Sequence, residues 1–330
     1  MNKMLFTCLS ALVLLAPTLA GCSSPAIASE TSAVPYKANI IAGAKVAEII
    51  HDRDVADLWA LYSATSGDPN TPPTLDAAIE QVERELGLHP KYCDTVTLFA
   101  DLSTILKSDP YFGVLVRFKI PAEHLLGIYS AFKNAEFPTV EHGGYDIRMV
   151  DSSLSFAFLS TDLVAAGPLH VVEDVLDTSL GTMPPLASTI CDAYGRSADA
   201  ALAIALEVPE DVKDAIPNLL NEDGVITDLS PFKDIAVVAL EVDKDEDYFV
   251  AEGQLHCGDA LSAEWVEALV RNDLARSKQM FDSPEMQNML QRVFVSRDEL
   301  IVSMNVAATS ADVKDLVYAS PWEDYTDQGV

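Results

Sequence analysis

The chain has 330 residues and a formal net charge of −30 at pH 7. Nucleic-acid binding requires clustered Lys and Arg, so a charge this negative excludes nucleic acid as the partner. It also indicates that the folded part is repelled by the surface of an anionic bilayer. Since 49% of the residues are hydrophobic, the chain can bury a sizeable core and is not disordered by composition.

The first 21 residues have the layout of an export signal. Lys3 precedes an apolar run over 4–15, which is too short to be a membrane-spanning helix. The segment ends on Leu19-Ala20-Gly21-Cys22, which resembles the lipobox of bacterial lipoproteins. The resemblance implies a signal peptide over 1–21, cleavage before Cys22, and a diacylglycerol on the Cys22 thiol. It implies a location on the extracytoplasmic side of a bacterial membrane, within the cell envelope.

Residues 22–34 are expected to form the lipidated cysteine and a flexible tether. The twelve residues after Cys22 are mostly small and polar and show no periodicity. A flexible segment of this length spans about 20 Å root-mean-square. No later apolar run is long enough to cross a bilayer, so the lipid is expected to be the membrane attachment.

The body shows three pairs of similar segments at nearly one separation, which indicates two tandem related units, over 35–185 and 186–319. A coincidence between similar αβ patterns is the alternative. Residues 320–330 are expected to form an acidic tail. The pairs, with their separations, are Tyr111-Phe112 and Tyr248-Phe249 (137), 158–162 and 294–298 (136), and Asp94 and Asp234 (140).

Each unit is expected to contain a pair of strands, over 94–102 and 113–120 in the first and 234–242 and 250–257 in the second. Their period-two alternation predicts strands with one buried face, paired as antiparallel hairpins. The fold class is therefore α+β, with a mainly antiparallel sheet and packed helices in each unit.

Helices and further β segments are expected to follow each hairpin. The β segments are placed at 146–166 and 293–306, each followed by a short closing helix near 171–176 or 313–317. Thr309 to Asp312 resembles a capping box for the last helix. An additional helix is expected over 74–87 in the first unit. The apolar stripes expected after the hairpins are Leu125, Ile128, Tyr129 and Phe132, and Leu261, Trp265 and Leu269.

The sequence contains no phosphate loop, dinucleotide fingerprint, H-E-x-x-H, paired C-x-x-C or G-x-S-x-G motif. We therefore expect no cofactor, and we assign no catalytic, cofactor-binding or metal-binding residue; Cys22 is the one site residue. Structural or surface roles are expected for all six histidines. They are His51, His89, His124, His142, His170 and His256.

Asp243 to Asp247 places acids at alternate positions, as calcium loops do. An EF-hand would need Gly and Glu where the sequence has Tyr248 and Gln254, so a hairpin connection is expected. A weak calcium site of another kind stays open. The aromatic pairs at 111–112 and 248–249 are expected in the core, with a binding groove as the alternative. Cys93, Cys191 and Cys257 could form one disulfide or remain free thiols.

These features favour a binding or structural protein of the envelope over an enzyme. Its partner would be a protein or another envelope component, besides the membrane reached through Cys22. One alternative is the solute-binding receptor of a transporter. Another is a hydrolase whose catalytic residues are dispersed along the chain, since such a site has no local motif.

Overall fold

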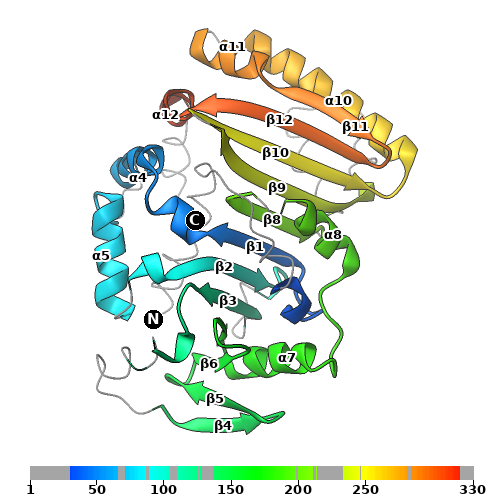
Figure 1. Ribbon diagram of the computed structural model, residues 1–330. Coiled ribbons are helices and arrows are strands. Elements are labelled where there is room, and N and C mark those ends of the chain that lie inside the picture. The colour runs from blue at the N-terminus through cyan, green and yellow to red at the C-terminus, as the bar shows by residue number, and fades with distance from the viewer. Residues whose placement is uncertain are drawn as a thin grey trace, which may run out of the picture.

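The structure of the chain is a computed structural model. In its described residues, 12 strands form one antiparallel sheet, with helices on both faces (Figure 1). The α+β fold class is therefore confirmed. The structure describes residues 30–65, 71–86, 89–104, 110–124, 127, 137–197, 200–210, 213, 233–245, 247–280 and 284–319. Cys22 and the expected tail over 320–330 lie outside these residues.

The strands are β1 (Ile40–Lys45), β2 (Cys93–Ala100), β3 (Phe112–Phe118), β4 (Thr139–His142), β5 (Tyr145–Met149), β6 (Ser155–Phe158), β7 (Leu163–Gly167), β8 (Leu202–Glu207), β9 (Ile235–Asp245), β10 (Tyr248–Cys257), β11 (Phe294–Asp298) and β12 (Ile301–Thr309). β1 and β8 are adjacent. Outward from β1 the order is β2, β3, β7, β6, β5, β4, and outward from β8 it is β9, β10, β12, β11. Far segments of the chain are thus neighbours in the sheet.

Helices lie on both faces because successive strand residues point to opposite sides. On β8, Ala203 and Ala205 pack with α7 (Leu169–Ser179), α8 (Ser188–Arg196) and the 3-10 turn η1 (Thr31–Ala33). We call this side the α7 face. The alternate residues Leu202 and Leu206 pack on the other side, the α10 face.

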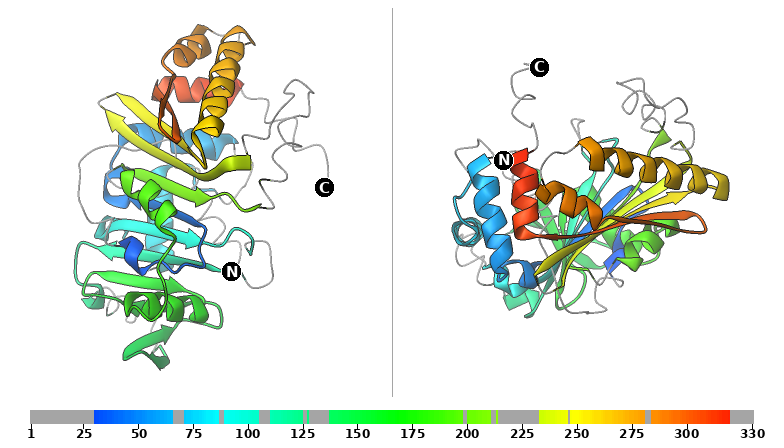
Figure 2. Two further views of the ribbon diagram at one scale, coloured as in Figure 1. Left: turned by 90° about the vertical axis from the view of Figure 1, so that its right-hand side faces the viewer. Right: turned by 90° about the horizontal axis from the view of Figure 1, so that it is seen from above.

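The α10 face is covered mainly by α4 (Arg53–Thr65), α5 (Leu75–Leu86), α10 (Ala260–Met280), α11 (Pro284–Gln291) and α12 (Ser310–Ala319), with the short α3 (Val46–Ile49) after β1 and η2 (Pro90–Tyr92) before β2. α4 and α12 lie side by side at one end of the sheet (Figure 2, right). None of the described helices is long and apolar enough to cross a membrane.

Several expected elements are present. β2 pairs antiparallel with β3, and β9 pairs antiparallel with β10. The helix expected over 74–87 is α5, and the short closing helices are α7 and α12. At the start of α12, Asp312 accepts a hydrogen bond from the Thr309 backbone N–H, while the Thr309 hydroxyl accepts one from the Asp312 N–H. The predicted capping box is confirmed.

Other elements differ from expectation. The segment 146–166, expected as one β region, divides into β5, β6 and β7. The adjacent strands β1 and β8 had no counterpart in the sequence-based prediction. The stripe expected over 125–132 lies outside the described residues.

The apolar stripe expected on α10 is wrong for its two largest residues, which do not pack on the sheet. Leu261 and Trp265 are exposed, at 66% and 47%. The buried side of α10 instead carries Ala263 and Val266, both 0% exposed. A hydrogen bond at the start of α10 orients the helix about its own axis, because the Ser262 hydroxyl donates to a carboxylate oxygen of Asp234 at 2.6 Å. The small buried residues allow α10 to lie close to the sheet.

The prediction of a flexible tether over 22–34 is also wrong for its last five residues. Glu30 to Val34 pack against the body: Glu30 and Val34 are each 0% exposed, and Ala33 is 5% exposed. The Leu186 N–H donates to the Val34 carbonyl at 2.7 Å. The composition indicates a flexible segment, but the Glu30 carboxylate pairs with the partly buried Arg117 of the sheet.

On the α7 face, β10, β12 and β11 carry no described helix (Figure 1). Directly opposed residues share a face, and Glu252 opposes both Glu241 and Asn305. Asn305 and Gln254 donate to the two Glu252 oxygens at 2.7 and 2.9 Å, and His256 Nε2 lies 3.2 Å from Gln254 Oε1. This part of the sheet is polar where the neighbouring strands are apolar.

Candidate functional site

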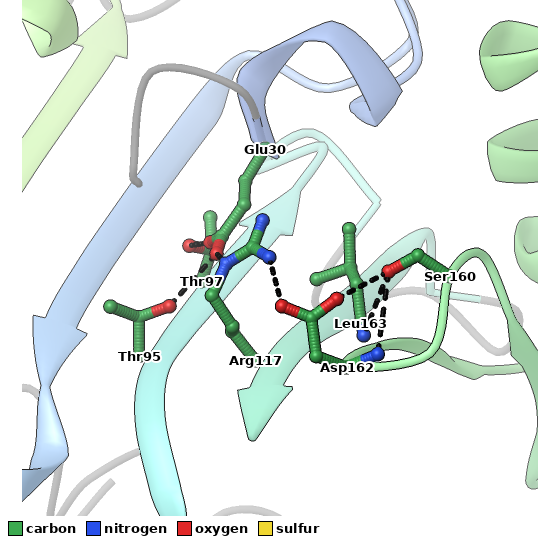
Figure 3. Close-up of polar contacts among 7 residues, drawn as sticks. All are labelled: Glu30, Thr95, Thr97, Arg117, Ser160, Asp162 and Leu163. Carbon is green, nitrogen blue, oxygen red and sulfur yellow. Dashed lines mark hydrogen bonds and ion pairs between the residues drawn. The ribbon is translucent and has the colours of Figure 1, made fainter. Parts of the chain in front are cut away.

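The most deeply buried charged group among the described residues is the carboxylate of Glu30. Its Oε1 accepts hydrogen bonds from Thr95 Oγ1 and from Arg117 Nε, each at 2.8 Å (Figure 3). Thr97 Oγ1 donates to Oε2 at 2.7 Å. Side chains of β2 and β3 therefore satisfy both oxygens of a charge that would be costly to bury alone.

Arg117 joins this carboxylate to a second one (Figure 3). Its Nη1 donates to Asp162 Oδ2 at 2.7 Å. The Ser160 hydroxyl donates to Asp162 Oδ1 at 2.6 Å and accepts from the Leu163 N–H at 3.1 Å, which fixes the β6–β7 turn. The Ser160 hydrogen bond, and Arg117 after it, hold the pKa of Asp162 below its ordinary value, against the opposing effect of burial.

We call Glu30, Thr95, Thr97, Arg117 and Asp162 the arm anchor, and residues 30–38 the arm. Beyond Glu30 the arm crosses the segment that links the two halves of the sheet, where the Tyr36 N–H donates to the Pro184 carbonyl at 3.2 Å. Lys37 Nζ then pairs with Asp174 Oδ2 of α7 at 2.7 Å. Charge and hydrogen bonds are matched throughout, as in a structural attachment.

Next to the arm anchor, Tyr194 of α8 lies over Gly43 of β1. Gly43 is paired with Thr97, and Tyr194 is 0% exposed, so that burial raises the pKa of its hydroxyl. A methyl group on Gly43 would lie 1.8 Å from the Tyr194 hydroxyl oxygen. Glycine at this position therefore permits the close approach of α8 to the middle of the sheet.

A separate open hollow of about 680 Å³ is lined by residues of α11, α12, the start of β10 and the end of β12. The Arg292 guanidinium carbon is 5.8 Å from the ring centroid of Tyr248, and Arg292 Nη2 is 2.7 Å from Asp312 Oδ2. This hollow combines an aromatic ring with a neutralised ion pair. Its lining residues are Tyr248, Asn288, Gln291, Arg292, Thr309 and Asp312.

Glu241 of β9 and Glu252 of β10 form a like-charged pair on the α7 face of the sheet. Burial raises the pKa of Glu241, and the charges of Glu252 and Asp243 raise it further. Like charges directly opposed on adjacent strands destabilise a sheet. The folded state therefore binds a proton at Glu241 more tightly than the unfolded state does.

Glu241→Gln is expected to stabilise the protein at neutral pH and to have little effect in acid. Stability associated with Glu241 is fully present below its unfolded pKa, about 4.3, and is lost as the pH rises through the raised folded pKa. Urea unfolding of both proteins at about pH 4 and about pH 7.5 checks this. The exposed Glu80→Gln serves as the control; equal stability changes for Glu241→Gln at both pH values would contradict the prediction.

The histidines do not gather into a site. His142 Nε2 lies 3.0 Å from Asp177 Oδ1, His89 Nδ1 accepts from the Lys91 N–H, and His256 contacts Gln254. Within the described ranges, no group of three or more His, Cys, Asp or Glu side chains is arranged to hold a metal ion. Cys93, Cys191 and Cys257 are free thiols.

The acidic run over 243–247 lies at the β9–β10 connection, as expected. Its lysine has a further role. Lys244 Nζ lies 2.6 Å from Asp52 Oδ2 and 2.9 Å from Asp54 Oδ2, so it ties β9 to the start of α4. Asp52 Oδ1 accepts from the Asp54 N–H at 2.8 Å, which places the acids at the helix start as the sequence indicated.

The aromatic pairs divide between the two roles considered for them. Tyr111 and Phe249 are buried, at 7% and 3% exposed. The core role is thus confirmed for these two. Tyr248 is 42% exposed and lines the hollow, so the core expectation is wrong for it. Its register explains this, since it faces the opposite side of β10 from Phe249.

No protein-family model matches the chain, and no curated protein matches it. Solved structures similar to it include three crystal forms of the protein TP0453, each 8% identical. Form III has a TM-score of 0.45 and the match covers 88% of this chain and 98% of that one. Forms I and IV each have a TM-score of 0.42. The match to form I covers 90% of this chain and 97% of that one, and the match to form IV covers 86% of this chain and 96% of that one. At this level of similarity no functional property is transferred.

Neither the arm anchor nor the hollow is predicted by a local sequence pattern. Glu30 and Arg117 are 87 positions apart. Neither residue belongs to a local sequence motif that would indicate its partner. The hollow joins residues from 248 to 312, on three separate elements. The aromatic pair at 248–249 was the one local signal, because a binding groove was the alternative role for it.

Proposed function

We propose that this protein is a lipid-anchored, extracytoplasmic protein of the bacterial envelope, attached through Cys22 and serving a binding or structural role. The lipobox resemblance of Leu19 to Cys22 supports the attachment. The observation that carries the proposal is the burial of Glu30 in the arm anchor, because it gives the lipid a rigid point of attachment on the body. We propose an envelope protein or another envelope component as the partner.

The arm anchor shortens the connection between lipid and body. Seven residues separate Cys22 from Glu30, where the composition suggested twelve. Even fully extended, this segment spans at most about 28 Å between the two Cα atoms. The body would therefore stay near the membrane surface while its negative charge opposes contact with anionic lipid.

We also propose that the body consists of two tandem related units, over 35–185 and 186–319. Support comes from the matching strand orders on the two sides of the β1–β8 pair. The order β1, β2, β3, β7, β6 on one side corresponds to β8, β9, β10, β12, β11 on the other. The paired aromatics found at 111–112 and 248–249 fall at the starts of the corresponding strands β3 and β10.

Cys22→Ser is expected to release the protein from the membrane and to leave it at precursor size. Lipidated Cys22 carries at least two acyl chains, which suffice for stable attachment, whereas the serine variant has none. Fractionation and gel mobility of the full chain measure both effects. Cys93→Ser, which removes a thiol outside the lipobox, should fractionate as the unmodified protein does; membrane retention of Cys22→Ser at mature size would refute the anchor.

A further inference from the structure

The hollow between α11, α12 and β10 has the chemistry of a ligand site. It is open to solvent, and its volume of about 680 Å³ is comparable to that of small-molecule sites. Tyr248 supplies an accessible aromatic surface, being 42% exposed. The Arg292 guanidinium lies against its ring, 5.8 Å from the centroid, which helps to hold the ring in place.

The charges that line the hollow cancel. Arg292 Nη2 is paired with Asp312 Oδ2 at 2.7 Å. Asp312 is held further by the Thr309 hydroxyl at 2.7 Å, and these hydrogen bonds, together with Arg292, lower its pKa against the effect of burial. An ionised ligand therefore finds no unbalanced countercharge here, and the net charge of −30 opposes anions in general.

The remaining lining groups are neutral and form hydrogen bonds in both directions. Asn288 and Gln291 lie three residues apart on α11, so that they share one side of the helix. Each amide has two N–H donors and one carbonyl acceptor. The combination of an exposed ring, two amides and a neutralised ion pair suits an uncharged ligand rich in hydroxyl groups.

We infer that this hollow binds a neutral saccharide, with one sugar ring against Tyr248 and its hydroxyls hydrogen-bonded by Asn288 and Gln291. The inference deepens the proposed function and rests on it, because an envelope location brings the protein to glycans. The C–H face of a sugar ring is apolar and fits an aromatic surface, while its hydroxyls pair with amides. The partner class for this site is therefore carbohydrate and not protein.

The test is a binding titration of the full lipidated chain in detergent with chitotetraose, maltotetraose and cellotetraose. Calorimetry and saturation-transfer NMR measure the binding. At least one should bind saturably, and Tyr248→Ala should weaken that binding about ten-fold or more. Tyr248→Phe should keep most of it. Tyr36→Ala, at a tyrosine exposed elsewhere, should leave it unchanged, and Gln291→Ala should weaken it without disturbing the buried core.

Absence of saturable binding by all three oligosaccharides would overturn the inference. So would saturable binding that Tyr248→Ala and Gln291→Ala both leave intact. The Cys22→Ser variant is titrated in parallel and should bind equally well. Loss of membrane attachment and loss of saccharide binding are then read separately, so that either proposal can fail alone.

Discussion

Glu30→Ala is expected to lower the free energy of unfolding by about 3–5 kcal/mol, the cost typical of breaking a buried ion pair. The substitution leaves the guanidinium of Arg117, which is 16% exposed, with one carboxylate in place of two. It also removes the acceptor of the Thr95 and Thr97 hydroxyls, both buried. Urea unfolding gives the free energy, and limited proteolysis reports detachment of the arm over 30–38.

Two controls distinguish the anchor from a general effect of charge. Glu30→Gln keeps the shape and loses the charge, so it should be destabilising but less so than alanine. Glu80→Ala removes an exposed acid on α5 and should change the free energy of unfolding by about 0.5 kcal/mol or less. A loss below about 1 kcal/mol for Glu30→Ala, with the arm still protected from protease, would show that the arm is not anchored by this carboxylate.

Gly43→Ala is expected to destabilise the fold by about 1–3 kcal/mol or more. The new methyl group would lie 1.8 Å from the Tyr194 hydroxyl oxygen, and Tyr194 cannot move freely because it is completely buried between α8 and the sheet. β1 or α8 must therefore shift at the middle of the sheet. Thermal and urea unfolding of the variant measure the loss.

Tyr194→Phe should rescue much of that loss. Without the hydroxyl, the ring atom nearest to the added methyl group is 3.0 Å away, a contact that a small shift relieves. The double variant should therefore lose less stability than the two single variants together, by about 1 kcal/mol or more. Additive losses would place the strain of Gly43→Ala somewhere other than at Tyr194.

Local patterns predicted the elements that have one buried face. The alternation along β3 and β10 and the apolar stripe of α5 are visible in sequence because one side packs and the other meets solvent. The capping residues Thr309 and Asp312 mark a helix start by short-range hydrogen bonds. Such features depend on residues only a few positions apart.

The middle of the sheet and the arm anchor depend on residues far apart. β1 and β8 are apolar along nearly their whole length because helices or the arm cover both of their faces, so neither shows a period of two. In α10, apolar residues on two sides of the helix made Leu261 and Trp265 as plausible in the core as Ala263 and Val266. In the sequence, Glu30 is one polar residue in a segment of small and polar residues. Only the folded structure brings Arg117 next to it.

The most direct test of the anchored arrangement is the mass of the N-terminal peptide of the protein isolated from the membrane fraction. Loss of residues 1–21 and a diacylglycerol thioether on Cys22, with at least two acyl chains, is the predicted result. A mature chain that begins at another residue, or that begins at Cys22 with a free thiol, would contradict it.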